Sequence, residues 1–289
     1  MPSPITLNKA AGSPTNSFDL QFHSVWLKRL PLEFDGFRIG VISDLHLGPF
    51  TGAAQIELLV QILSAQELDL AVALGDFIHE PFIRRTRKAR EHAGLCAAAL
   101  AGLQSRYGTY AVLGNHDLRT DAAIVNEALT AHGIRVLCNS SEEIDLDGAR
   151  LWIAGVDDVL EGSPKLDWAL AGVPESGPTI LLAHEPDYAD QACHYPIDLQ
   201  LSGHTHGGQV RLPGCKPLYL PEMGKKYPAG FYNVNSLKLY TSRGIGMSLV
   251  PLRWQCPPEL AVLTLRSAGL SSYQSDSPIL SKAGIDLFT

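Results

Sequence analysis

Short apolar runs alternate with amphipathic stretches along the first two thirds of the chain. The run from Phe37 to Ser43 is followed by Ile56, Leu59, Val60 and Leu63, which recur at helical spacing. A short, bounded apolar run indicates a buried strand, whereas apolar residues three and four positions apart indicate one face of a helix. We therefore predict a strand, a loop and a helix in that order.

The same alternation continues towards the C-terminus and then gives way to strands alone. A further helix is predicted at about 84–103, and further strands are predicted at 70–74, 109–113, 151–154, 179–183 and 198–202. Beyond position 207 the strand-like runs are 209–212, 230–234, 237–241 and 259–265. Such α/β units followed by β-rich sequence favour an α/β fold, a four-layer αββα sandwich of two mixed β-sheets flanked by helices.

Composition sets the domain limits. Residues 1–21 are rich in Ser, Pro, Asn and Gly without apolar periodicity, so we expect a loose N-terminal extension. Residues 267–289 are expected to form a polar C-terminal tail. Between them, 22–266 is expected to form one domain, because motifs that carry chemistry are spread from position 44 to position 206. The 45% of apolar residues suffices for its core.

Five short motifs rich in His and Asp lie directly beyond predicted strands. They read Asp44-Leu45-His46, Gly75-Asp76, Gly114-Asn115-His116-Asp117, the single His184 in LLAHEPD, and Gly203-His204-Thr205-His206. Strand ends at one edge of an open α/β sheet converge on a shared crevice, so we expect these motifs to meet. Gly75, Gly114 and Gly203 each directly precede a ligand, which indicates positive φ or a close backbone approach at these strand exits. Imidazole, carboxylate and amide groups without a thiolate fit Mn, Fe or Zn.

In this order, the five motifs resemble those of the calcineurin-like metallophosphoesterase superfamily, over roughly positions 37 to 266. Four later stretches are similar to the bacterial YkuE and YaeI-like phosphodiesterase branch. They are GHTHGGQVRLP at 203–213, KKYPAGFY at 225–232, TSRGIG at 241–246 and LRWQCPPELAVLTL at 252–265. The resemblance implies a metal-dependent phosphoric ester hydrolase.

The resemblance also divides the ligands between two divalent cations, with manganese expected and iron or zinc as alternatives. Asp44 and His46 stand two positions apart on an extended segment and can approach one ion together. The other implied ligands are His206 for that ion, Asp76 as the bridge, and Asn115, His184 and His204 for the second ion. A carboxylate bridge brings two cations to about 3.5–4 Å, where a shared hydroxide can attack phosphorus in line.

The third motif supplies the predicted catalytic residues. His116 follows the ligand Asn115, so it is presented beside the site, and the resemblance implies that it protonates or stabilises the leaving oxygen. Asp117 is expected to orient that imidazole or its loop.

Substrate contacts are predicted at His79, Arg211 and Arg243, with structural or solvated roles as the alternative. His79 closely follows GDF, and the two arginines lie beyond the last ligands, where a basic side chain could hold a second phosphate or a head group. Asp157 and Asp158 are expected to hold a loop through hydrogen bonds rather than to act as acid and base.

The net charge limits the binding partners that we expect, and the cysteine pattern indicates the cellular compartment. The net charge of −7 gives no basic footprint, so long nucleic acid is not expected, and the basic run at 84–90 is interpreted as a solvated helix face. The five cysteines are odd in number and include no CxxC pair, which favours reduced thiols and a cytoplasmic location. No signal peptide or membrane span is predicted, and peripheral membrane contact stays open.

The function expected from the sequence is a phosphodiesterase that acts on a small phosphodiester or a lipid-linked phosphate. The alternatives are a phosphomonoesterase or a nuclease with the same centre, and a catalytically silent scaffold of the same fold. The intact set of predicted ligands argues against the scaffold, and the acidic composition argues against the nuclease.

Overall fold

The computed structural model describes residues 18–80, 85–212, 217–248 and 250–269. The first strand, β1 (Asp19–Leu27), begins three residues before the predicted domain start at Phe22, and the last strand, β12 (Glu259–Ser267), ends at Ser267. Most of the predicted N-terminal extension and C-terminal tail lies outside the described residues, so their looseness remains a prediction.

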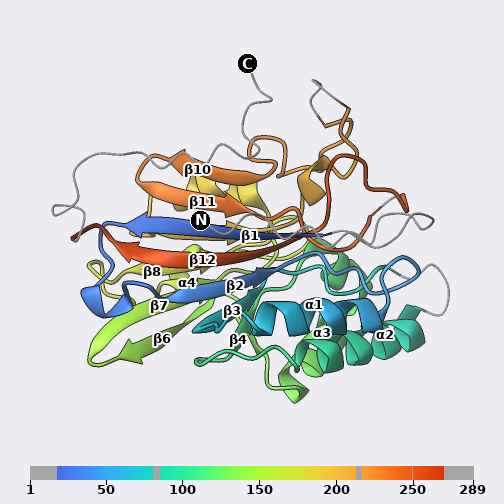
Figure 1. Cartoon of the computed structure of the whole chain (residues 1–289), viewed down its shortest axis with the longest axis horizontal. Helices are drawn as coiled ribbons and strands as arrows, with labels where there is room; N and C mark the ends of the chain where they lie inside the picture. Colours follow the sequence, from blue (N-terminus) through green and yellow to red (C-terminus); the bar gives the residue numbers. More distant parts are fainter. Residues whose placement is uncertain (1–17, 81–84, 213–216, 249, 270–289) are drawn as a thin grey trace.

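Two mixed six-stranded sheets form the centre of the molecule (Figure 1). Sheet one has the order β1-β12-β2-β3-β4-β5, with β2 (Arg38–Ile42), β3 (Leu70–Ala73), β4 (Thr109–Ala111) and β5 (Arg135–Val136). Sheet two has the order β10-β11-β9-β8-β7-β6, formed by β6 (Ser140–Leu146), β7 (Ala149–Gly155), β8 (Thr179–Leu182), β9 (Leu199–Ser202), β10 (Gly230–Val234) and β11 (Leu237–Thr241). Antiparallel pairs occur at β12–β2, β10–β11 and β6–β7, and the other pairs are parallel.

Helices cover the outer face of each sheet. Three long helices, α1 (Ala53–Ser64), α2 (Arg85–Leu100) and α3 (Asn115–Ala131), pack on sheet one, and the short α4 (Leu166–Ala169) and α5 (Ala189–Ala192) pack on sheet two. The 3-10 turns are η1 (Leu32–Phe34), η2 (Pro186–Tyr188) and η3 (His206–Gly208). The predicted four-layer αββα sandwich is thus confirmed, with a central core between the sheets and an outer core under each helical layer.

The parallel strands carry almost unbroken apolar sequence because both of their faces are buried. All four residues of β3 are buried: Leu70 and Val72 join the core between the sheets, while Ala71 and Ala73 face the helices. Strands buried on both faces are expected to lose the alternation of apolar and polar residues. The small residues on the helix side let α1 and α2 lie close to the sheet.

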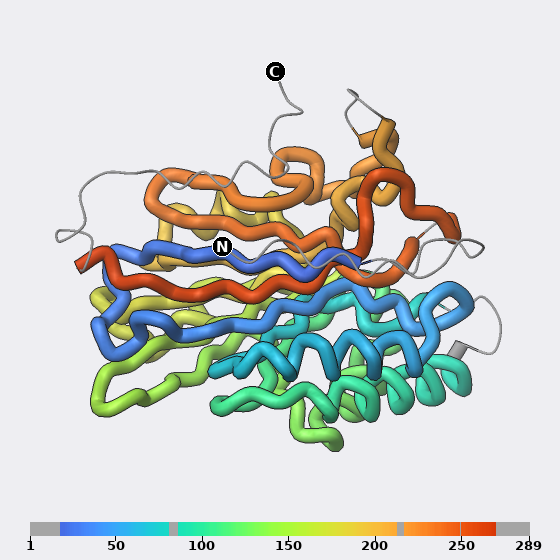
Figure 2. The backbone as a smooth tube through the Cα atoms, viewed as in Figure 1, coloured from blue at the N-terminus to red at the C-terminus, as the bar shows by residue number. Residues whose placement is uncertain are grey.

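The structure has elements that the sequence interpretation did not predict, namely α3, α4, α5, β5 and β6, and two further stretches differ from it as well. No strand was predicted for Asp19–Leu27, which pairs in parallel with β12 at the far end of the chain (Figure 2). The strand predicted at 209–212 is wrong, because Gly207, Gly208 and Gln209 have φ of 59°, 82° and 52°, outside the extended region. Only Val210 makes an isolated bridge there, to Trp254.

The basic run on α2 shows exposed side chains, as predicted. Arg87, Lys88 and Arg90 are all exposed on the helix surface, whereas Ala89 is buried. Arg84 lies outside the described residues. These side chains therefore form a solvated helix face.

Stability should depend on the protonation of His23 in β1. Its ring lies 5.1 Å from the ring of Phe231 and 5.7 Å from that of Tyr240, and burial lowers the pKa of His23. The unfolded chain then binds a proton below about pH 6.5 that the folded chain does not, so stability present above that pH is lost as pH falls. His23→Phe should remove this dependence, which is at most about 1.4 kcal/mol per pH unit, in urea unfolding between neutral and mildly acidic pH. The prediction would be contradicted if the free energy of unfolding changed with pH in the same way in the unchanged protein and in His23→Phe.

Candidate metal centre

The strand ends bring all seven predicted ligands together. Strands β2 and β3 end just before Asp44 and Asp76, β4 leads to Asn115 at the start of α3, and β8 and β9 lead to the remaining histidines. All seven side chains are buried, with exposed fractions of 6% or less. The ends of β2, β3 and β4 in sheet one therefore meet those of β8 and β9 in sheet two.

Five of the seven ligands have a left-handed backbone. They are Asp44, His46, Asp76, His204 and His206, with φ between 44° and 71°. Only twelve non-glycine residues in the described part of the chain have positive φ, so this conformation is concentrated at the site. Non-glycine residues adopt it at a cost in free energy, and such strain gathers at functional sites. The exits from the strands turn sharply enough to aim the side chains inward.

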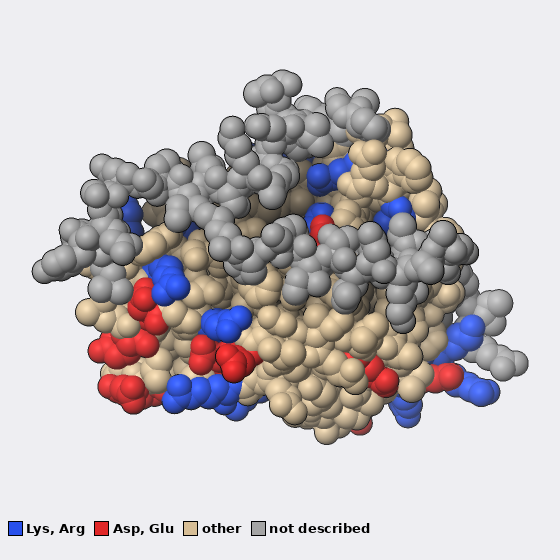
Figure 3. Space-filling model, in the orientation of Figure 1, with Lys and Arg blue, Asp and Glu red and all other residues tan. Residues whose placement is uncertain are grey.

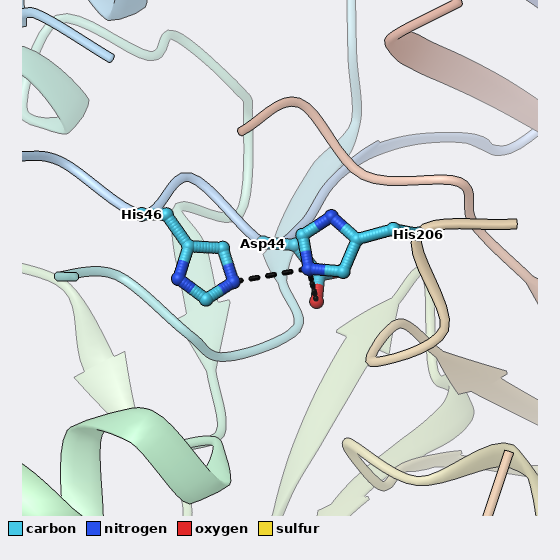
Figure 4. A group of neighbouring side chains, drawn as sticks. All are labelled: Asp44, His46 and His206. Atoms are coloured by element: carbon cyan, nitrogen blue, oxygen red, sulfur yellow. Dashed lines mark hydrogen bonds and ion pairs between the residues drawn. The ribbon is translucent and has the colours of Figure 1, made fainter. Parts of the chain in front are cut away.

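The first ligand set is Asp44, His46 and His206 (Figure 4). The Nε2 atoms of the two histidines lie 3.0 Å apart, and His206 Nε2 lies 3.6 Å from Asp44 Oδ1. Ligand atoms with bonds of about 2.1 Å to one cation lie roughly 3 Å apart when they are at right angles. Asp44 is further held by Ser43 Oγ, which donates to its Oδ2 at 2.5 Å, and by the backbone N–H of His204.

The second set is Asn115, His184 and His204. His204 Nε2 donates to the carbonyl oxygen of Glu222 at 2.8 Å, so its Nδ1 keeps a lone pair, which faces Asn115 Oδ1 at 3.1 Å. His184 Nδ1 donates to the carbonyl oxygen of Leu74 at 2.6 Å, which leaves Nε2 buried without a hydrogen-bond partner. Metal-binding histidines commonly have this arrangement, with the second ring nitrogen held by a carbonyl.

Asp76 joins the two sets. Its Oδ2 lies 3.5 Å from His46 Nε2 and 3.3 Å from His184 Nε2, and its Oδ1 accepts a hydrogen bond of 2.8 Å from the N–H of His116. Burial alone would raise the pKa of Asp76, but His184 and His116 hold it well below its usual range. One ionised oxygen therefore faces both histidine groups, as a bridging ligand must.

The donor set fits two divalent cations. Three groups of potential ligands have their ligand atoms close together: Asp44, His46 and His206; Asp76, His184 and His204; and His46, Asp76 and His116. Burial lowers the pKa of His46 and of His204 to about 3, so both rings stay neutral and can bind a cation at neutral pH. A buried Nε2 without a partner and facing lone pairs are what a cation would satisfy.

Asp117 contacts backbone rather than an imidazole. Its Oδ1 accepts from the N–H of Phe77 at 2.9 Å and of Ile78 at 3.3 Å, and its Oδ2 accepts from the N–H of Gly114 at 3.0 Å. These bonds join the loop after β3 to the start of α3. Of the two tasks foreseen for Asp117, the contacts correspond to orienting the loop. A catalytic part for it stays a prediction.

His116 and His79 lie beside the ligands. The ring of His116 packs edge-on against that of His46, with centroids 4.8 Å apart, and the ring of His79 stacks 6.5 Å from that of His116. Burial lowers the pKa of His79, so it is neutral at physiological pH. Both rings are within reach of a substrate held at the ligands, and their roles stay predictions.

The two arginines predicted to contact substrate differ in their contacts. Arg243 donates to Glu259 Oε2 at 2.5 Å and to Asp19 Oδ2 at 3.0 Å, so its guanidinium ties β12 to β1. These contacts give no support to a phosphate-binding role for Arg243. Arg211 donates through Nε to the carbonyl oxygen of Gly207 at 2.6 Å and has no carboxylate partner among the described residues.

Arg253 is a site residue that the sequence interpretation missed. Its guanidinium donates to the carbonyl oxygens of Gly246 and Arg243, at 2.6 and 2.9 Å, and its Nη2 lies 3.1 Å from His206 Nδ1. It therefore connects the last ligand loop to the segment after β11. It lies in the stretch LRWQCPPEL, whose resemblance to the YkuE and YaeI-like branch does not by itself single out this arginine.

The carboxylate pair at 157 and 158 supports a loop, as predicted. Asp157 Oδ2 accepts from the N–H of Ser163 at 2.8 Å, and Asp158 Oδ1 accepts from the N–H groups of Leu160 and Glu161 at 3.1 and 2.7 Å. These bonds shape the turn that follows β7.

Glycines make room for the ligands. Gly75 has φ of +92°, and a Cβ there would lie 2.7 Å from His184 Nδ1 and 2.6 Å from the nitrogen of Gly114. A Cβ at Gly203 would overlap Ser43 Oγ and Asp44 Oδ2. The expected close backbone approach before the ligands is thus confirmed.

A four-layer αββα sandwich that gathers His, Asp and Asn around one shared carboxylate defines a two-metal phosphoester hydrolase. The chain belongs to the calcineurin-like phosphoesterase family, whose model matches residues 37–208. It is 35% identical to the uncharacterized metallophosphoesterase YkuE of Bacillus subtilis, over 85% of this chain and 84% of the relative. It is 31% identical to the phosphodiesterase YaeI of Escherichia coli, over 79% and 82%.

Two further proteins are similar to this chain, but the chain spans less than two thirds of each of them. A Bos taurus transmembrane protein with a metallophosphoesterase domain is 32% identical over 91% of this chain, and the chain spans 59% of that relative. Within the described residues here, no helix combines the length and apolarity needed to cross a membrane. The Thermus thermophilus sulfate thiohydrolase SoxB shares the fold, with a TM-score of 0.50 at 12% identity, over 82% of this chain and 57% of SoxB.

Gly203→Ala should damage the site through its crowded neighbours. The added methyl group must displace Ser43 or the carboxylate of Asp44, so we expect a loss of about 1–3 kcal/mol in stability and weaker metal binding. Gly94→Ala in α2 is the matched control, because a Cβ there meets nothing within 4 Å. It should instead stabilise the helix by about 0.5–1 kcal/mol. Urea unfolding and Mn²⁺ titration of both variants measure this, and equal effects would refute the prediction.

Removing Arg253 should weaken metal binding beyond any general loss of stability. Arg253→Met frees the ring of His206 and its loop, so affinity for Mn²⁺ should fall by roughly ten- to a hundred-fold, as for other residues that orient ligands. Arg29→Met is the control, since Arg29 also makes several hydrogen bonds, with Asp198 and the carbonyl of Pro196, at the opposite end of β9. Calorimetric titration of each metal-stripped variant with Mn²⁺ measures the loss of metal affinity separately from the loss of stability. A similar loss of affinity in both variants would show that Arg253 acts only through stability.

Proposed function

We propose that the chain is a phosphodiesterase that uses two divalent cations, with manganese as the working choice. The observation that carries the proposal is the position of Asp76 Oδ2, which lies within 3.5 Å of imidazole nitrogens from both ligand sets. When bound, the two cations would neutralise charge on the phosphate and provide an activated water molecule. Nitrogen and oxygen donors without a thiolate support manganese, and they equally admit iron or zinc.

The chain's own residues divide this work in a definite way. Asp44, His46 and His206 would hold one cation, Asn115, His184 and His204 the other, and Asp76 both. The carbonyl oxygens of Leu74 and Glu222 hold one ring nitrogen of His184 and His204, so the opposite nitrogen is presented to the cation. Binding therefore needs no change of tautomer at His204, whereas at His184, whose pKa Asp76 raises against the effect of burial, a proton would leave Nε2.

His116 would assist the leaving group. It lies in the first turn of α3, beside the ligand Asn115, where the positive end of the helix dipole favours an anionic phosphate. Its half-buried ring would direct an N–H towards the leaving oxygen, while Asp117 keeps the loop in place through backbone bonds. His79 flanks the same position and would contact the substrate.

The proposed substrate is a small phosphodiester or a lipid-linked phosphate. The relative YaeI is named a phosphodiesterase, which supports a diester. In the lower part of the face in Figure 3, Lys and Arg stand next to Asp and Glu without forming a continuous basic patch, which supports a small substrate rather than long nucleic acid. The cysteine pattern supports the cytoplasm as the location.

Metal-stripped protein restored with Mn²⁺, Fe²⁺, Zn²⁺ or Mg²⁺ should hydrolyse bis(p-nitrophenyl) phosphate faster than p-nitrophenyl phosphate. Asp76→Asn should lower turnover at least about a hundred-fold, because it removes a ligand rather than a residue that orients one. Asp147→Asn is the matched control: Asp147 has the same φ of 55° as Asp76, but it is exposed on the turn between β6 and β7.

The outcomes separate the candidate activities. Diester turnover that requires metal and fails only in Asp76→Asn would support the proposal. A preference for the monoester would replace it with a phosphatase. No turnover with any of the metals would favour a silent scaffold of this fold.

A further inference from the structure

Six large apolar side chains stand out from the surface in two short segments beside the metal centre. With exposed fractions between 45% and 64%, they are Leu212, Leu218, Tyr219, Val250, Leu252 and Trp254, and we call them the apolar rim. They make up six of the thirteen large exposed apolar residues in the part of the chain that the structure describes. Scattered exposed apolar residues are ordinary, whereas a contiguous group marks a binding surface.

Hydrogen bonds hold the two segments together as one surface. The N–H of Arg211 donates to the carbonyl oxygen of Trp254, and the N–H of Trp254 donates to that of Gln209, both at 2.9 Å. The side chain of Gln209 donates to the carbonyl oxygens of Ser248 and Val250 at 2.9 and 2.8 Å. The polar backbone is thus paired inward, and the apolar side chains are left facing outward.

The apolar rim adjoins the catalytic ligands. Gln209 follows His206 by three positions, and Arg253, between Leu252 and Trp254 in the chain, contacts His206. Figure 1 shows the two loops, in orange and red, at the same corner of the molecule. A partner on the rim would therefore be next to the metal centre.

The charge around the rim favours an anionic partner. The sequence has no Asp or Glu from Thr205 to Pro221 or from Thr241 to Pro258, although the chain has a net charge of −7. Arg243 and Arg253 in these stretches are held by protein groups, but the guanidinium of Arg211 has no carboxylate partner among the described residues. Nearby, Lys225 is exposed, and its ammonium has no partner among the described residues. Tyr and Trp rings settle at the head-group level of a bilayer, Leu and Val side chains enter below them, and Lys and Arg bind anionic lipids.

We propose that the apolar rim docks the enzyme on an anionic lipid surface and so presents the metal centre to phosphodiesters in the head groups. This inference rests on the proposed function for its substrate, but the docking itself can be measured without turnover. Six side chains on two loops would enter the surface without a membrane-spanning helix.

The test uses the metal-loaded full chain and vesicles of phosphatidylcholine, with or without phosphatidylglycerol. The rim variant is Leu218→Ser with Trp254→Ser, and the matched control is Leu58→Ser with Trp168→Ser, which removes two equally exposed apolar side chains from α1 and α4. Co-sedimentation should show binding to the anionic vesicles that falls about ten-fold or more in the rim variant and is unchanged in the control. Turnover of soluble bis(p-nitrophenyl) phosphate should be the same in all three proteins.

Three results would overturn the docking proposal. They are no binding of the unchanged protein to anionic vesicles, equal binding by the rim variant, and equal binding to neutral vesicles. A dimer that the rim variant dissociates, seen by light scattering, would instead assign the rim to a second copy of this chain. Failure of the unchanged protein to hydrolyse the soluble diester would count against the proposed function alone, because the vesicle measurement does not depend on turnover.

Discussion

The structure depends on one electrostatic constraint, which is the concentration of buried lone pairs around Asp76. Asp76 Oδ2 lies 3.5 Å from His46 Nε2 and 3.3 Å from His184 Nε2, and all three side chains are buried. Buried polar groups without partners are costly, and burial lowers the pKa of His46 and His204, whereas at His184 the carboxylate of Asp76 outweighs burial and raises the pKa. Two divalent cations satisfy this arrangement, and hydrolysis of a phosphoester is the chemistry that such a pair supports.

The remaining features of the site serve to hold those groups in place. Left-handed backbone at five ligands turns the chain sharply inward after β2, β3 and β9, and the glycines at 75 and 203 allow neighbouring loops to touch. Asp117 joins two of the ligand loops through backbone N–H groups, and Arg253 joins the last one to the segment after β11. The β-sheets supply the rigidity, since every parallel strand near the site is buried on both faces.

How far the sequence predicts the molecule depends on how local each signal is. The parallel strands that lead to the motifs, β2, β3, β4, β8 and β9, could be predicted because each apolar run and the motif beyond it are contiguous in the chain. The assignment of the seven ligands comes from the family resemblance and stays a prediction. The strand β1 was not predicted because its partner β12 is at the opposite end of the chain. The helix α3 was not predicted because non-helical backbone at Asp121 interrupts it. Arg253 and the true conformation at 209–212 arise from tertiary contacts and left-handed residues, which leave no periodic trace.

The most direct measurement is anomalous diffraction from crystals of the protein soaked in Mn²⁺, recorded at the manganese absorption edge. The account predicts two peaks about 3.5–4 Å apart, one on each side of Asp76, with His46 and His206 at one and His184 and His204 at the other. A single peak, or peaks that do not share Asp76, would contradict the two-metal centre on which the account rests.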